Sequence, residues 1–105
     1  MQHIDEHHSG QEIQIRPGDM FELCLSENRT TGFRWGLDCD GSPSCTLIED
    51  RFEPSSRLPG AAGIHRWQFQ AARVGQGHIE LSSRRPWESQ GAAARTFVVR
   101  IRVEA

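Results

Sequence analysis

Apolar and polar residues alternate along most of this 105-residue chain, and the alternation limits the folds that the chain can adopt. The clearest run is the last, in which Phe97, Val99, Ile101 and Val103 share one face of an extended chain. Side chains of a β-strand point to opposite faces in turn, so a period of two predicts a strand with one buried face. Further strands are predicted over residues 12–16, 21–25, 33–37, 46–52, 66–71 and 79–81.

Turn residues separate these runs, and no stretch keeps the 3.6-residue apolar period of a helix. Pro17-Gly18-Asp19, Pro54-Ser55-Ser56 and Gly75-Gln76-Gly77 are interpreted as turns. About seven to eight short strands joined in this way indicate an all-β sandwich. The connections are too short for crossover helices, which favours antiparallel pairing. The length suits a single domain, residues 1–105.

Residues 1–10 are polar and contain His3, His7 and His8. We expect a flexible N-terminal tail there. The spacing of the histidines is too loose to indicate a metal site. The segment has neither the basic nor the apolar region of a signal peptide. A cytoplasmic chain and a periplasmic or secreted chain whose signal has been removed would look alike, so the compartment stays open.

Charge and hydropathy argue against two classes of partner. The net charge is −2, and the arginines are interspersed with Asp and Glu, whereas a nucleic-acid-binding protein concentrates basic residues. No apolar run approaches the roughly 20 residues of a membrane-spanning helix. A soluble monomer that needs no cofactor is expected.

Catalytic chemistry is not indicated either. Three cysteines, Cys24, Cys39 and Cys45, leave at least one thiol unpaired; a Cys39–Cys45 bridge is conceivable, but reduced thiols are favoured. An enzyme would have to draw on these thiols or on the polar residues His65, His78, Glu49 and Asp50. None of these forms a recognisable nucleophile–base pair, phosphate loop or metal motif, so the chain is expected not to be an enzyme.

Three connecting segments have unusual compositions. In the first loop (residues 28–33), the β-branched Thr30 and Thr31 stiffen the chain, Gly32 permits a positive φ, and Asn28 can bond neighbouring backbone. These residues predict a rigid, narrow, uncharged tip, as opposed to a plain hairpin loop. Phe33 at its base and Trp35 beyond it are expected to reach the core.

The second loop (residues 58–64) exposes bare backbone and could pair with another chain, although a flexible linker is an alternative. In the third loop (residues 83–88), Pro86 directs Trp87, and an exposed Trp beside Arg85 is typical of a binding hot spot. The alternative for Trp87 is a lid folded back on the core.

The three motifs, in order, resemble those of the chagasin family of cysteine-peptidase inhibitors. They read Asn-x-Thr-Thr-Gly-Phe-x-Trp from residue 28, Leu-x-Gly-x-x-Gly from residue 58 and Arg-Pro-Trp from residue 85. The resemblance runs from about Gly18 to the C-terminus. It implies an immunoglobulin-like β-sandwich that inhibits papain-like peptidases of the cathepsin type reversibly and competitively.

The resemblance also implies which residues contact the peptidase. The first loop would enter the active-site cleft, and the other two loops would flank it. The implied contact residues are Asn28, Arg29, Thr30, Thr31, Gly32, Phe33, Leu58, Gly60, Ala61, Ala62, Gly63, Arg85, Pro86 and Trp87.

Two positions depart from the family pattern. Arg29 stands where the family usually has Pro, which removes one fixed φ and adds a charge beside the tip. Ala62 stands where many members have Gly. Asn28-Arg29-Thr30 is also a glycosylation sequon, which we interpret as accidental because a glycan would obstruct the loop. The competing hypothesis is a generic immunoglobulin-like recognition module without a peptidase target.

Overall fold

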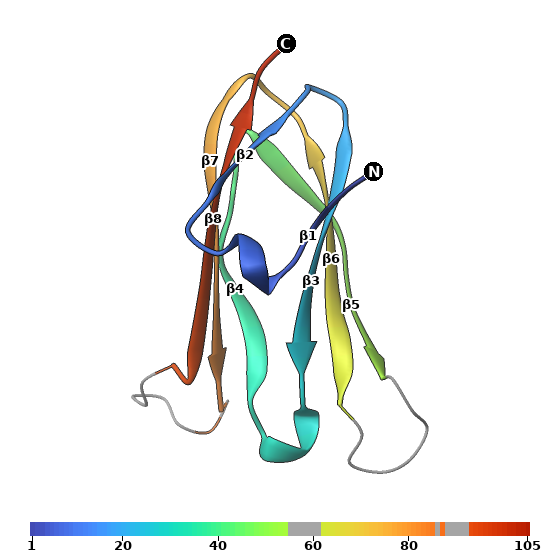
Figure 1. Cartoon of the computed structure of the whole chain (residues 1–105), viewed down its shortest axis with the longest axis vertical. Helices are drawn as coiled ribbons and strands as arrows, with labels where there is room; N and C mark the ends of the chain where they lie inside the picture. Colours follow the sequence, from blue (N-terminus) through green and yellow to red (C-terminus); the bar gives the residue numbers. More distant parts are fainter. Residues whose placement is uncertain (55–61, 86, 88–92) are drawn as a thin grey trace.

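A computed structural model describes residues 1–54, 62–85, 87 and 93–105 of the chain. Its strands form two four-stranded sheets that face each other, in the orders β1-β3-β6-β5 and β2-β8-β7-β4 (Figure 1). Their bounds are β1 (Gln2–Ile4), β2 (Glu12–Ile15), β3 (Met20–Glu27), β4 (Arg34–Asp40), β5 (Cys45–Pro54), β6 (Gly63–Ala71), β7 (Gly75–Arg84) and β8 (Arg95–Val103). Two short 3-10 turns, η1 (Glu6–His8) and η2 (Arg29–Thr31), complete the elements. The predicted all-β sandwich is confirmed.

The core lies between the sheets and is filled by the alternating positions. In β3 and β6, the ring of Phe21 stacks on that of Phe69 with centroids 5.2 Å apart, and Leu23 is in register with Trp67. The four apolar residues of β8 that share a face are all buried, facing these side chains from the second sheet. The period of two therefore identified the inward face of each of these strands.

The short connections predicted antiparallel pairing, but two pairs of strands are parallel. β1 runs parallel to β3, and β2 runs parallel to β8. Neither pair is consecutive in the chain, so the length of a direct connection does not restrict their direction. The remaining pairs, β3–β6, β5–β6, β4–β7 and β7–β8, are antiparallel.

Residues 1–10 differ from the flexible tail expected from their polar composition. β1 pairs with β3, and Ile4 is only 1% exposed. The side chain of Asp5 then caps η1, accepting the His7 amide at 2.9 Å, while its own amide donates to Nδ1 of His8 at 3.1 Å. The β1–β3 pairing, the burial of Ile4 and the cap of η1 together account for the order of this segment.

The turn predicted at Gly75-Gln76-Gly77 is also wrong, because these residues begin β7 and the chain reverses at residues 72–74. Gly77 is glycine for a different reason. A Cβ there would press on the backbone of Gly41, so the residue allows two chain segments to approach closely.

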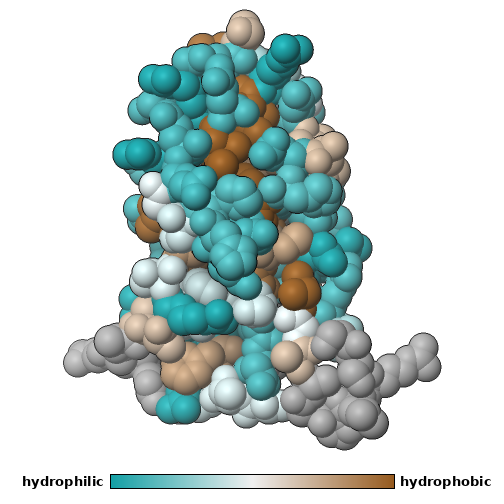
Figure 2. Space-filling view, in the orientation of Figure 1, coloured by the Kyte–Doolittle hydropathy of each residue, from teal (hydrophilic) through white to brown (hydrophobic). Residues whose placement is uncertain are grey.

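The ends of the sandwich differ in what they carry. The connections β3–β4, β5–β6 and β7–β8 leave at one end, and the C-terminus lies at the other (Figure 1). The face in Figure 2 is mostly hydrophilic, with a narrow hydrophobic strip in the half opposite these connections. No helix among the described residues is long and apolar enough to span a membrane.

Candidate functional site

Strand register brings the ends of the three loops together. Glu27, the last residue of β3, and Pro54, the last of β5, both pair with Gly63 at the start of β6. In the other sheet, Arg34 at the start of β4 pairs with Arg84 at the end of β7. The three segments singled out in the sequence therefore leave the sandwich at the same end.

The first loop is held by its own side chains. Oδ1 of Asn28 accepts the amide of Thr30 at 3.1 Å and its hydroxyl at 2.6 Å. The hydroxyl of Thr31 donates to the Asn28 carbonyl at 2.8 Å, and Gly32 then has a φ of +84°. The positive φ and the bonding role of Asn28 are confirmed. The result is the turn η2, with exposed, uncharged Thr30 and Thr31 side chains.

The Trp87 side chain of the third loop lies against the first loop. It is 69% exposed, so it is not a lid on the core. A Cβ added at Gly32 would overlap the far edge of its six-membered ring. The tip of the indole therefore lies against the bare backbone of Gly32, while most of the side chain stays exposed to solvent.

Arg85 makes a second connection between the same two loops. Its Nε donates to the Thr31 carbonyl at 3.3 Å, and its guanidinium carbon lies 4.5 Å from the centre of the Phe33 ring. The distance to Phe33 is within the range of a cation–π contact. The first and third loops thus form one continuous surface before any partner binds.

The remaining predicted contact residues are placed only in part. Ala62 is exposed, whereas Gly63 is buried in β6, where a Cβ would overlap the Phe52 ring and the Glu53 carbonyl. Close packing of strands thus explains a glycine at 63. Arg29 lies in η2, and its side chain is outside the description. Leu58, Gly60, Ala61 and Pro86 lie outside the described residues.

Sequence reasoning missed the residues that close the neck of the first loop. Nε1 of Trp35 donates to the Ser26 carbonyl at 2.9 Å, and Arg95 donates to the same oxygen at 2.7 Å. The carboxylate of Glu27 accepts the Trp35 amide, and it also contacts His65. A signal existed, because Glu27 and His65 continue the inward-facing positions of β3 and β6.

The described thiols are not poised for chemistry. All three cysteines are unbridged, and burial raises the pKa of both Cys24 and Cys45 to about 11. A nucleophilic cysteine needs the opposite shift, because the thiolate is the reactive form. Cys39 is exposed, and desolvation with the neighbouring Glu80 raises its pKa too.

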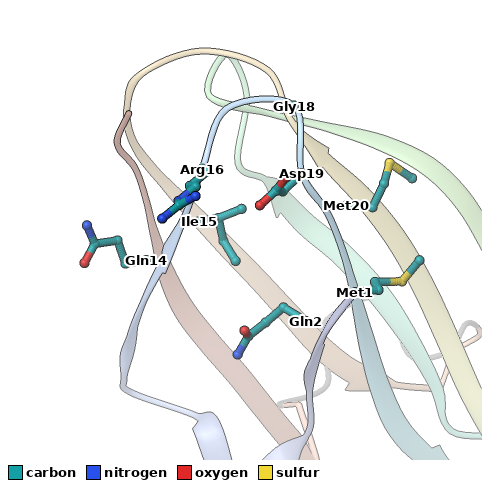
Figure 3. Close-up of a pocket in the computed structure, with 8 residues that line it drawn as sticks. All are labelled: Met1, Gln2, Gln14, Ile15, Arg16, Gly18, Asp19 and Met20. Atoms are coloured by element: carbon teal, nitrogen blue, oxygen red, sulfur yellow. The ribbon is translucent and has the colours of Figure 1, made fainter.

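A pocket of about 660 Å³ opens at the opposite end of the sandwich, between β1, β2 and β3 (Figure 3). Its lining mixes methionine and glutamine side chains with Arg16 and Asp19 and includes no thiol or imidazole. It lacks the converging acid, base and nucleophile of a hydrolytic site.

Taken together, the fold and the end that carries the three loops define a β-sandwich with preformed loops, a class of protein suited to binding a protein partner. The family model described as Chagasin family peptidase inhibitor I42 matches residues 14–101. The chain belongs to the chagasin family of peptidase inhibitors. It is therefore an inhibitor and not an enzyme, and the generic recognition module is set aside.

Similar proteins agree with this assignment. Amoebiasin-1 of Entamoeba histolytica is 31% identical over 103 residues, which cover 96% of this chain and 98% of the relative. The crystal structure of a cysteine protease inhibitor from Entamoeba histolytica has a TM-score of 0.86 at 21% identity, covering 98% of this chain and 95% of that one. PbICP-C, solved in complex with falcipain-2, has a TM-score of 0.73 at 15% identity, covering 99% of this chain and 100% of that one. The last two likenesses show the shared fold.

Proposed function

We propose that this protein is a reversible, competitive inhibitor of papain-like cysteine peptidases, whose active-site cleft the first loop enters while the other two loops flank it. The observation that carries the proposal is the contact of Trp87 and Arg85 with residues 31–33, which joins two loops into one rigid surface. PbICP-C, which shares the fold of this protein, was solved in complex with falcipain-2, a papain-like cysteine protease, and that complex supports the choice of partner.

The shape and charge of the first loop suit a deep, narrow cleft. Its tip consists of Thr30, Thr31 and Gly32, which carry no charge. No charged group of these three residues has to lose its hydration when the tip enters the cleft. The peptide groups of η2 are wound into a 3-10 turn, whereas a peptidase attacks an extended peptide. A coiled backbone does not reach the near-attack geometry that cleavage requires, so the loop occupies the cleft uncut.

Preorganisation would make the binding tight. Ordering a free side chain costs about 0.5–1.5 kcal/mol on association, and the first loop is already ordered by Asn28, Gly32 and the third loop. Trp87 would supply the large apolar contact, since its ring is exposed and already oriented. Residues 58–63 would lie on the other side of the cleft, as the family resemblance implies.

The direct test is a titration of papain with the purified protein, using a fluorogenic peptide substrate. We expect competitive inhibition that reverses on dilution, with the inhibitor recovered uncut and one monomer bound per peptidase in gel filtration. Absence of inhibition at micromolar concentration by a folded sample, against papain and a cathepsin alike, would refute the proposal.

A further inference from the structure

The two ends of the first loop belong to different sheets. β3, which precedes the loop, pairs with β1 and β6, whereas β4, which follows it, pairs with β7. No β-ladder therefore joins β3 to β4, in contrast to an ordinary hairpin, where the ladder closes the neck of the loop. Some other interaction has to fix the distance between the two strand ends.

Glu27 makes that connection. It is the last residue of β3, is only 2% exposed, and accepts the backbone amide of Trp35 on Oε1 at 2.6 Å. A hydrogen bond to a charged acceptor is shorter and stronger than one between neutral groups. The Glu27 side chain thus links the two strand ends across the sheets, next to the bond from the Trp35 indole to the Ser26 carbonyl.

His65 holds Glu27 in place from β6. Its Nδ1 lies 3.4 Å from Oε2 of Glu27, and its Nε2 bonds to the carboxylate of Asp50 on β5. The imidazole also stacks on the Trp67 ring, with centroids 4.0 Å apart and planes 2° from parallel. Ring stacking and a polar partner at each nitrogen hold the orientation of His65, and His65 in turn restrains the Glu27 carboxylate.

A buried carboxylate is a costly choice if the only requirement is to fill the core. Desolvation of the charge has to be offset by partners, and an apolar residue would fill the same inward position of β3 without that cost. The partners of Glu27 that are described here lie at the neck of the loop and on the strand behind it. The network of Glu27, His65 and the Trp35 amide therefore lies where it can fix the position of the first loop.

We propose that Glu27 and His65 are positioning residues for inhibition: they hold the neck of the first loop closed and so set its geometry before the peptidase arrives. This inference rests on the proposed function. It predicts that breaking the network weakens inhibition more than the accompanying loss of stability explains, because the folded protein would carry a splayed loop.

The test compares Glu27→Ala, Glu27→Gln and His65→Gln with a control, Ile101→Ala, which removes core volume in β8 away from the loops. The inhibition constant for papain is measured at a temperature where circular dichroism shows every sample folded. We expect Glu27→Ala to raise it at least tenfold and His65→Gln at least threefold. Glu27→Gln, which keeps an acceptor for the Trp35 amide, should stay within about threefold of the wild type, as should Ile101→Ala.

A spectroscopic readout separates positioning from stability. An amide proton bonded to a carboxylate at short distance resonates far downfield, so the Trp35 amide should lie downfield in the wild type and move upfield in Glu27→Ala. If Glu27→Ala does not fold, His65→Gln, which leaves Glu27 in place, is read in the same two ways.

Two results would overturn the inference. One is a folded Glu27→Ala or His65→Gln variant with an unchanged inhibition constant. The other is an Ile101→Ala variant that loses inhibition to the same extent, which would make the effect one of general stability. A wild-type protein that inhibits neither papain nor a cathepsin would instead refute the proposed function, while the Trp35 amide shift would still report on the neck.

Discussion

Gly32→Ala is the smallest change that separates the backbone of the first loop from the packing of Trp87 on it. Gly32 has a φ of +84°, and an added Cβ would overlap the Trp87 ring. A left-handed conformation costs an L-residue with a Cβ about 1–2 kcal/mol. The ring is 69% exposed, so it can swing outward at little cost to stability.

The chain provides a matched control at the opposite end. Gly18, in the turn between β2 and β3, has a φ of +87°, and a Cβ there would meet nothing within 4 Å. Gly18→Ala and Gly32→Ala should therefore lose a similar amount of stability, about 1–2 kcal/mol, with a fall in melting temperature of about 4–8 °C for each kcal/mol. Thermal denaturation followed by circular dichroism measures both.

Inhibition should distinguish the two variants. If Trp87 is a hot spot worth about 2 kcal/mol or more, its displacement raises the inhibition constant for papain at least tenfold. Gly18→Ala should inhibit as the wild type does. In the double variant of Gly32→Ala with Trp87→Ala, the alanine at position 32 should cost little beyond Trp87→Ala alone, because the ring it would displace is gone.

Either of two outcomes would refute this reasoning. Equal inhibition constants for the two glycine variants would mean that the Trp87 contact does not contribute to binding. Additive losses in the double variant would mean that the Cβ acts on the peptidase directly and not through the ring.

Three further predictions can be checked with the same assays. Trp87→Ala should weaken inhibition tenfold or more and leave the melting temperature unchanged, because the ring is mostly exposed; Val74→Ala, another exposed apolar site at 66%, should change neither quantity. Arg85→Ala removes the bond to the Thr31 carbonyl and the contact with Phe33, so we expect a loss of about 1 kcal/mol, or about fivefold, in the inhibition constant. At pH 8, a thiol reagent should label Cys39 first in the native protein and all three cysteines only in denaturant, since a thiol with a pKa near 11 is about one part in a thousand thiolate; fast labelling of a second native thiol would contradict this.

Local patterns were enough to predict most of the architecture. Alternation depends only on which side chains prefer water, so it identified the inward positions of β3, β6 and β8 without any knowledge of the fold. The conformation of Gly32 and the bonds made by Asn28 were predictable for a similar reason, because they involve residues at most a few positions apart. The family resemblance also rests on short, ordered motifs.

The errors concern contacts between residues far apart in the sequence. The order in residues 1–10 depends on Ile4 finding a place beside β3, and the parallel strands pair with distant partners. Gly75 and Gly77 look like turn residues in the sequence, but both lie in β7, and Gly77 faces the distant backbone of Gly41. A pattern within one segment contains no information about which other segment will lie beside it.

The features of the candidate site likewise separate into those that depend on local interactions and those that depend on contacts between distant residues. The sequence by itself predicted an uncharged tip at residues 30–32, the positive φ of Gly32 and an exposed Trp87, since composition and backbone preference act locally. Only the tertiary structure decided that Trp87 rests on Gly32, and that the inward-facing Glu27 and His65 meet behind the neck of the loop. Those contacts join two strands and two loops, and they form only when both sheets are assembled around one core.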